Sequence, residues 1–198
     1  MRDFGATKSL FQEGTQIFML QLESKRTLLR RLKLSDFENM RKLESDLEIM
    51  KFTRPRLAQT PQQTQIRLEK LIAKELEYGD FGVWVAETKQ GSEFVGWFML
   101  LPTKDEYPEL GFMIVKKYWG QGFAPEVCEA LIHYGFETLE VPGVAAMTNI
   151  DNFRSIRVLE KVGFKFIKID NVPDEVLGGT VDLKVFHLTK FQNKTSGK

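Results

Sequence analysis

The segment from Lys116 to Glu137, "KKYWGQGFAPEVCEALIHYGFE", decides the fold prediction for this chain. Small and apolar residues recur at helical spacing from Ala124 to Gly135, and Pro125 suits a first helical turn because it has no amide to leave unpaired. Before this predicted helix, Gly120 and Gly122 can adopt positive φ and let a ligand approach the backbone. The preceding residues 109–115, "ELGFMIV", predict a short buried strand.

A strand, a glycine-rich loop and a helix in this order are typical of an anion-binding site. The first turn of a helix carries N–H groups without intrahelical partners and a partial positive charge. The sequence therefore predicts that a phosphate group binds at the loop and at the start of the helix that follows it.

Composition limits the remaining possibilities. The chain has 198 residues, of which 42% are hydrophobic and 12% aromatic, so one domain with a sizeable core is expected. The 28 basic and 27 acidic residues leave no basic field for nucleic acid. The single cysteine, Cys128, excludes an intrachain disulfide framework, and with two histidines it offers no metal cluster. No signal peptide or membrane span is apparent, so we expect a cytoplasmic protein without membrane partners.

Outside the opening segment, the pattern predicts a mixed α/β domain. A capping box at Ser35 and Glu38 predicts the start of the first helix. Because several strands follow one another directly, an antiparallel or mixed sheet is favoured over a strictly alternating parallel fold. Residues 1–21 are expected to be an extension, residues 22–191 the domain and residues 192–198 a tail. Strands are expected at 26–34, 82–88, 93–100, 109–115, 143–150, 165–170 and 181–191, and helices at 35–46, 61–79, 123–137 and 152–163.

Three motifs in this order resemble the GNAT superfamily of N-acetyltransferases. They are "YWGQGFAPEV" at 118–127, the pair Asn152 and Ser155 in N-x-x-S spacing, and "VLEKVGF" at 158–164. Within the superfamily, the chain is most similar to the RimJ/RimL branch, which includes enzymes that act on N-termini of ribosomal proteins. The resemblance covers residues 22–191. It implies a splayed, mostly antiparallel central sheet flanked by helices, and acetyl-CoA as the cosubstrate, with its pyrophosphate on the glycine loop.

The resemblance also implies a set of site residues. Trp119 stands where the family's general loop pattern has Gln or Arg, which is a feature of the RimJ/RimL branch. Leu159 stands where many members have a tyrosine acid, so Ser155 is expected to replace that acid. The cofactor contacts implied in this way are Met113, Ile114, Val115, Trp119, Gly120, Gln121, Gly122, Phe123, Ala124, Asn152 and Ser155.

The chemistry of acetyl transfer assigns roles to some of these residues. A free α-amine has a pKa of about 7.7–8.0, so a modest base or a water relay suffices to make it neutral. Glu109, which opens the strand before the loop, is the expected base, and a backbone N–H between Met113 and Val115 is the expected donor to the developing oxyanion. Ser155 is expected to donate to the leaving sulfur. No covalent enzyme intermediate is needed, and Cys128 lies on the apolar helix face.

The same residues also allow interpretations other than an acetyltransferase site. Glu109 also fits an ordinary carboxylate at a strand end, and Asn152 and Ser155 also fit helix caps. A dinucleotide-binding oxidoreductase is disfavoured, because Pro125 replaces the third glycine of G-x-G-x-x-G. A non-catalytic CoA-binding relative is a further alternative.

The expected acceptor is a primary amine, most readily the α-amine of a protein or peptide N-terminus, with a small-molecule amine as the second choice. Residues 52–60 and 173–179 are the segments expected to face it. Both a monomer and a homodimer are compatible with the sequence.

Overall fold

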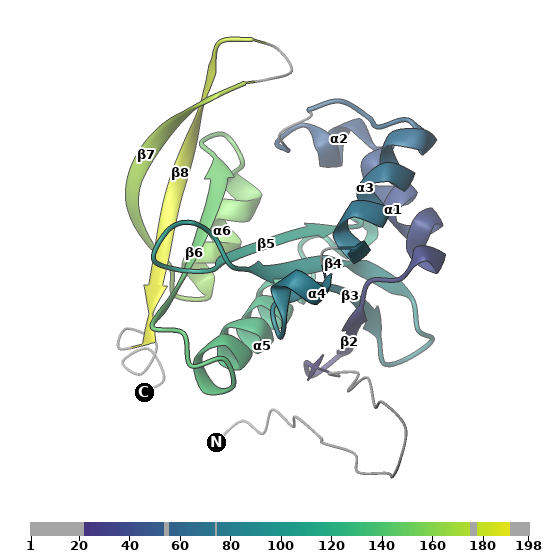
Figure 1. Ribbon diagram of the computed structural model, residues 1–198, viewed down its shortest axis with the longest axis horizontal. Helices are drawn as coiled ribbons and strands as arrows, with labels where there is room; N and C mark the ends of the chain where they lie inside the picture. The colour runs from purple at the N-terminus through teal and green to yellow at the C-terminus, as the bar shows by residue number, and fades with distance from the viewer. Residues whose placement is uncertain (1–21, 54–55, 74, 175–177, 191–198) are drawn as a thin grey trace.

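A computed structural model describes residues 22–53, 56–73, 75–174 and 178–190 (Figure 1). Within these residues, eight strands form one sheet in the order β1-β2-β3-β4-β5-β6-β8-β7. Neighbouring strands are antiparallel except β5 and β6, which are parallel. The mixed α/β fold with a mostly antiparallel sheet is therefore confirmed. The expected extension at 1–21 and tail at 192–198 lie outside the described residues, so the domain limits stay predictions.

The predicted elements occur in the predicted order, with three differences: a two-residue strand lies at 22–23, a short helix lies at 47–50, and the single helix predicted at 61–79 is divided into two. The strands are β1 Leu22–Glu23, β2 Thr27–Arg31, β3 Gly82–Thr88, β4 Phe94–Leu101, β5 Glu109–Ile114, β6 Gly143–Asn149, β7 Lys165–Pro173 and β8 Thr180–Thr189. The helices are α1 Phe37–Glu44, α2 Leu47–Met50, α3 Pro61–Ala73, α4 Glu75–Tyr78, α5 Phe123–Glu137 and α6 Phe153–Lys161, with short 3-10 turns η1 Leu34–Asp36 and η2 Lys116–Tyr118.

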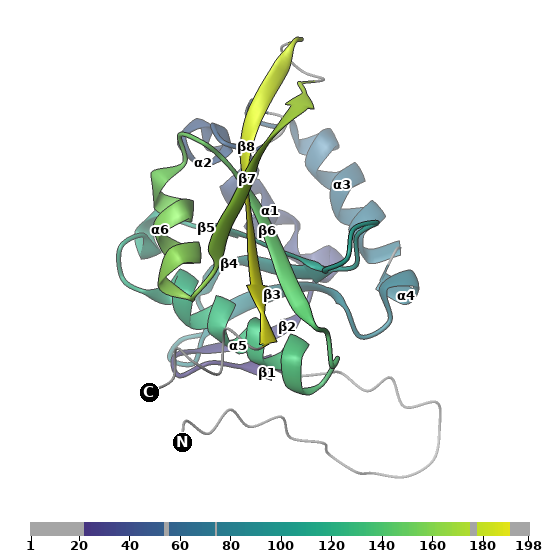
Figure 2. The ribbon, with the colours of Figure 1, turned by 90° about the vertical axis from the view of Figure 1, so that its left-hand side faces the viewer.

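Helices cover both faces of the sheet (Figures 1 and 2). Successive side chains in a strand point to opposite faces, so Trp84 of β3 joins the core under α5 and α6, whereas Val83 and Val85 join the core under α1 and α3. The apolar face of α5 buries Val127, Cys128 and Leu131 against the first of these cores. This packing explains why residues 123–137 fold as a helix.

The parallel strands β5 and β6 diverge, as Figure 1 shows. They pair only at Glu109 and Ala145, where the Ala145 amide donates to the Pro108 carbonyl at 2.8 Å. Beyond this point β5 continues beside β4 as far as Ile114, and β6 continues beside β8 as far as Asn149. Among the described residues, the C-terminal half of β5 therefore has an edge without a strand partner.

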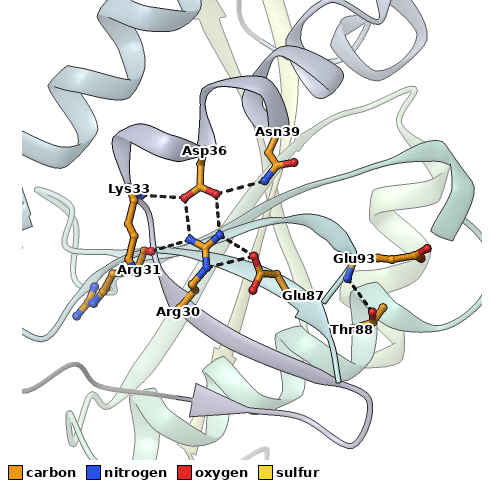
Figure 3. A network of polar contacts seen from close by, with 8 residues as sticks. All are labelled: Arg30, Arg31, Lys33, Asp36, Asn39, Glu87, Thr88 and Glu93. Atoms are coloured by element: carbon orange, nitrogen blue, oxygen red, sulfur yellow. Dashed lines mark hydrogen bonds and ion pairs between the residues drawn. The ribbon is translucent and has the colours of Figure 1, made fainter. Parts of the chain in front are cut away.

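An arginine-centred network holds the start of α1 to the sheet (Figure 3). The Arg30 guanidinium donates to both carboxylate oxygens of Asp36 at 2.7 Å and to Glu87 at 2.6 Å, and the Lys33 amide donates to Asp36 at 2.9 Å. Burial alone would raise the pKa of Asp36, but the hydrogen bonds from Arg30 and Lys33 lower it below its usual value. The same bond to Asp36 raises the pKa of Arg30. The network ties β2, η1 and β3 together.

The predicted capping box at Ser35 and Glu38 is wrong. Helix α1 begins at Phe37, its N-cap position is Asp36, and Ser35 lies inside the 3-10 turn η1. The Asp36 side chain makes no capping hydrogen bond to α1; its carboxylate accepts from the Lys33 amide nearby in the chain and from Arg30 of the sheet.

Candidate functional site

The glycine loop between β5 and α5 has its backbone open to a ligand. Gly120 and Gly122 have φ of +74° and +80°, and Gly122 is the N-cap residue of α5. A β-carbon on Gly120 would meet no atom within 4 Å. Within the described part of the chain, the amides of Gly122, Phe123 and Ala124 donate to no protein acceptor. These donors at a helix N-terminus fit a phosphate group.

Arg26, in the turn between β1 and β2, braces this loop. Its guanidinium donates to the Gln121 carbonyl at 3.1 Å and to the Glu126 carboxylate at 2.7 Å, and it lies 3.9 Å from the centre of the Phe123 ring. Burial would raise the pKa of Glu126, but hydrogen bonds from Ser24 and Arg26 lower it. Local sequence patterns do not identify Arg26 as a site residue, because the residues it contacts lie 95 or more positions away.

The direction of the β5 backbone decides which amides face the divergence between β5 and β6. The Val115 amide donates to the Val95 carbonyl at 3.0 Å, so it points to β4. Backbone groups alternate along a strand, so Met113 points to β4 as well, whereas Phe112 and Ile114 point to the open edge. The Trp119 indole agrees with this, since it donates to the Ile114 carbonyl at 2.9 Å. Of the three amides predicted at 113–115, only that of Ile114 faces this edge.

A charged cluster connects the loop to α2 and α6. The Lys116 ammonium lies 2.9 Å from Asp46 and 2.8 Å from Glu48. The Arg154 guanidinium lies 3.2 Å from Glu48 and 4.4 Å from the centre of the Trp119 ring system. The hydrogen bond with Lys116 lowers the pKa of Glu48 and raises that of Lys116. Two cations thus lie beside the glycine loop, and carboxylates of α2 balance them.

On the β6 side of the divergence, the start of α6 carries Asn152 and Ser155. Asn152 is the N-cap residue of α6, and its Oδ1 accepts the Ser155 amide at 3.2 Å. The Ser155 side chain is half-buried. One turn later, Leu159 is 1% exposed and belongs to the core. A leucine in the place of the family's tyrosine therefore serves packing.

Glu109 lies on the opposite face of the sheet from the α5 core. By alternation its side chain shares a face with Gly111 and Met113, and Met113 packs in the core under α1 and α3. Phe112 lies three positions after Glu109, or about 10 Å along the strand, and Ile114 lies five positions after it, or about 17 Å. Phe112 is thus the nearer of the two amides at the open edge.

The two segments expected to face the acceptor contact each other. Arg56 and Asp174 lie 3.6 Å apart, and Asp174 is buried. Arg56 has a φ of +51°, in the left-handed region that favours glycine. Residues 54–55 and 175–177 of these segments lie outside the described residues. In α1, one oxygen of the buried Glu44 carboxylate pairs with Arg67 at 2.8 Å, and its other oxygen has no partner among the described residues.

The single cysteine is not placed for catalysis. Cys128 is buried in the α5 core, and this burial, with a smaller contribution from Glu129, raises the pKa of its thiol. A buried thiol with a raised pKa is a poor nucleophile. Among the described residues, no helix is both long and apolar enough to cross a membrane.

Comparison with known proteins identifies the family. Residues 26–165 match the acetyltransferase (GNAT) domain. The N-acetyltransferase p20 of Bacillus licheniformis is 26% identical over 174 residues, which cover 87% of this chain and 97% of p20. The protein YkkB of Bacillus subtilis (strain 168) is 36% identical over 97 residues, which cover 48% of this chain and 56% of YkkB. The match therefore spans little more than half the length of YkkB.

Three solved structures share the fold. A GNAT-family acetyltransferase from Bacillus anthracis has a TM-score of 0.75 and 22% identity, covering 85% of this chain and 98% of its own. Spermidine N-acetyltransferase from Vibrio cholerae, solved with CoA and spermine, has a TM-score of 0.70 and 19% identity, covering 85% and 98%. A Salmonella typhimurium enzyme that modifies the N-terminal serine of a 50S ribosomal protein has a TM-score of 0.72 and 14% identity, covering 84% and 96%.

The geometry agrees with these matches, since the open loop amides and the unpaired β5 edge fit the acetyl-CoA that the family uses. The chain belongs to the GNAT family of acetyltransferases.

Proposed function

We propose that this enzyme acetylates the α-amine of a protein or peptide N-terminus. The observation that carries the acceptor choice is the state of two buried carboxylates, Glu44 and Asp174. One oxygen of Glu44 is paired with Arg67 and the other has no partner among the described residues, and Asp174 is paired with Arg56. A polyamine site needs several clustered carboxylates to attract a multiply charged cation, whereas a single ammonium group does not. The Salmonella neighbour, which modifies an N-terminal serine, supports the same choice.

In this proposal the cosubstrate lies along the divergence between β5 and β6. The amides of Gly122, Phe123 and Ala124, together with Trp119, Gly120 and Gln121, form the pyrophosphate site. The open edge of β5 at Phe112 and Ile114 offers hydrogen bonds to the chain of the cosubstrate. Asn152 and Ser155 border the site from α6. Acetyl-CoA supplies the activated acetyl group, as a thioester.

Each residue of the site has a separate role in acetyl transfer. Glu109 receives the proton of the attacking amine, by way of a water molecule because the distance along β5 is long. The Phe112 amide is the donor best placed for the developing oxyanion, since it faces the open edge and is nearer to Glu109 than the Ile114 amide. The Ser155 hydroxyl donates to the departing sulfur. Met113 and Val115 contribute through packing and the β4–β5 ladder, because their amides face β4.

A competition assay tests the acceptor. Thiol release from acetyl-CoA is measured with four acceptors: a short peptide with a free N-terminus, the same peptide blocked at the N-terminus but bearing lysine, free amino acids, and spermidine. The unblocked peptide should react fastest. Faster acetylation of spermidine, the substrate named for the Vibrio neighbour, or of the blocked peptide would refute the α-amine assignment. Acetyl-CoA binding without turnover of any amine would contradict catalysis itself.

A further inference from the structure

Two cations reach one carboxylate from opposite sides of the divergence between β5 and β6. Lys116 follows the end of β5 in the turn η2, and Arg154 lies in the first turn of α6, which follows β6. Both contact Glu48 of α2: the Lys116 ammonium lies 2.8 Å from Oε2, and the Arg154 guanidinium lies 3.2 Å from Oε1. The Glu48 carboxylate therefore bridges the elements that follow the two diverging strands.

This bridge lies beside the glycine loop. The Arg154 guanidinium lies 4.4 Å from the centre of the Trp119 ring system, and the Trp119 indole donates to the Ile114 carbonyl at 2.9 Å. Trp119 thus connects the open edge of β5 to Arg154, and the next residue along the chain is Gly120. Figure 2 shows α2 beside the start of α6, as the contact between Glu48 and Arg154 requires.

Water reaches both ion pairs, so another anion can replace the carboxylate. The side chains of Arg154, Glu48 and Lys116 are 65%, 51% and 40% exposed, and ion pairs with such exposure contribute little to stability. A phosphate monoester carries nearly two negative charges at pH 7 and has three acceptor oxygens, whereas a carboxylate carries one charge on two oxygens. A phosphate monoester is therefore a stronger partner for two adjacent cations than Glu48 is.

We propose that Lys116 and Arg154 bind the 3′-phosphate of acetyl-CoA, and that Glu48 occupies this site until the cosubstrate displaces it. Acetyl-CoA contains a pyrophosphate and a separate phosphate monoester at the 3′ position of its ribose. The proposal rests on the pyrophosphate site proposed above at the glycine loop, which leaves the monoester for the neighbouring cations. Glu48 is thus a carboxylate inside the binding site that opposes binding of the cosubstrate.

Calorimetric titration with acetyl-CoA and with 3′-dephospho-acetyl-CoA tests the proposal. Arg154→Gln and Lys116→Met should each weaken binding of acetyl-CoA about fivefold or more, because each removes a charged partner of the 3′-phosphate. Both should change binding of the dephospho compound by about twofold or less. Glu48→Gln should bind acetyl-CoA about threefold to tenfold more tightly than the wild type, because a neutral amide competes less for the cations and does not repel the phosphate.

Glu93→Gln is the matched control for Glu48→Gln. Glu93 is similarly exposed and lies 2.7 Å from Lys117, the residue next to Lys116, so this variant removes the same charge from a neighbouring ion pair. It should leave the affinity for both compounds unchanged. Gly122→Ala, titrated beside these variants, should weaken binding of both compounds alike, so a failure of the pyrophosphate site is seen separately from a failure of the 3′-phosphate site.

Two results would overturn the proposal. One is that Arg154→Gln and Lys116→Met affect the two compounds equally or affect neither, because the cations then do not distinguish the 3′-phosphate. The other is that Glu48→Gln binds acetyl-CoA no more tightly than the wild type, because Glu48 then does not compete with the cosubstrate. A gain in affinity cannot arise from loss of the fold, so this second result is decisive for Glu48.

Discussion

Replacing Gly122 by alanine separates the strain in the glycine loop from its role in binding. Gly122 has a φ of +80°, and its added β-carbon would lie 3.6 Å from Arg26 Nη2, an ordinary contact. The left-handed conformation costs an alanine about 1–2 kcal/mol. For a domain of this size, that corresponds to a fall in Tm of about 2–8 °C.

Gly91→Ala provides a matched control for this substitution. Gly91, in the turn between β3 and β4, has a φ of +84°, and its added β-carbon would lie 3.9 Å from Glu93, again an ordinary contact. The two substitutions should therefore lower Tm by similar amounts. Only the Gly122 variant changes the backbone at the proposed phosphate site.

Calorimetric titration with acetyl-CoA measures how much each of the two substitutions weakens binding of the cosubstrate. Gly122→Ala should raise the dissociation constant at least about tenfold, or by about 1.4 kcal/mol, because the loop amides must shift to relieve the strain. Gly91→Ala should bind like the wild type, and Gly122→Val should bind no measurable cosubstrate. If folded Gly122→Ala binds acetyl-CoA as tightly as the control, the loop does not hold the cosubstrate.

The remaining predictions concern the other residues of the site and its support. Glu109→Gln should lower turnover and make turnover rise more steeply with pH, because the amine must then lose its proton unaided. A variant whose turnover depends on pH as in the wild type would contradict the role of Glu109 as the base. Ser155→Ala should reduce turnover only a few-fold in the same assay, since the thiol is a tolerable leaving group. Arg26→Gln should weaken acetyl-CoA binding in calorimetry by releasing the loop, and unchanged affinity would show that the brace is dispensable. Asp36→Asn should lower the free energy of unfolding by about 3 kcal/mol at pH 7, because it leaves Arg30 without its main partner. The pKa of Asp36 in the folded state lies below its ordinary value of about 3.9, so the stability that its carboxylate contributes is present above that pH and is lost below it. Denaturant titrations should therefore show that the difference in free energy of unfolding between the wild type and Asp36→Asn becomes smaller as the pH falls below about 4.

Local patterns in the sequence were sufficient to predict most elements. Strand β3 spans the predicted residues 82–88, and α5 follows the glycine loop as expected. Both elements were predicted from the periodicity of their side chains and from glycine and proline residues, and these signals act over only a few positions of the chain. The family resemblance implied a splayed, mostly antiparallel sheet, but the strand order and the divergence of β5 from β6 came from the structure, since periodicity alone does not specify strand neighbours.

Only the tertiary structure determined which groups reach the site. Whether the Met113 or the Ile114 amide is accessible depends on which residue of β4 lies opposite, and a shift of one position exchanges the two edges. The Arg26 brace depends on β1 and β2 lying beside the start of α5, across about half of the chain. The Asp36 carboxylate at the start of α1 is held by Arg30 of the sheet in addition to the Lys33 amide nearby in the chain. Sequence periodicity reports which face of an element is buried, but the hydrogen-bond partners of a backbone or a charge are set by long-range pairing, which arises only when the sheet forms.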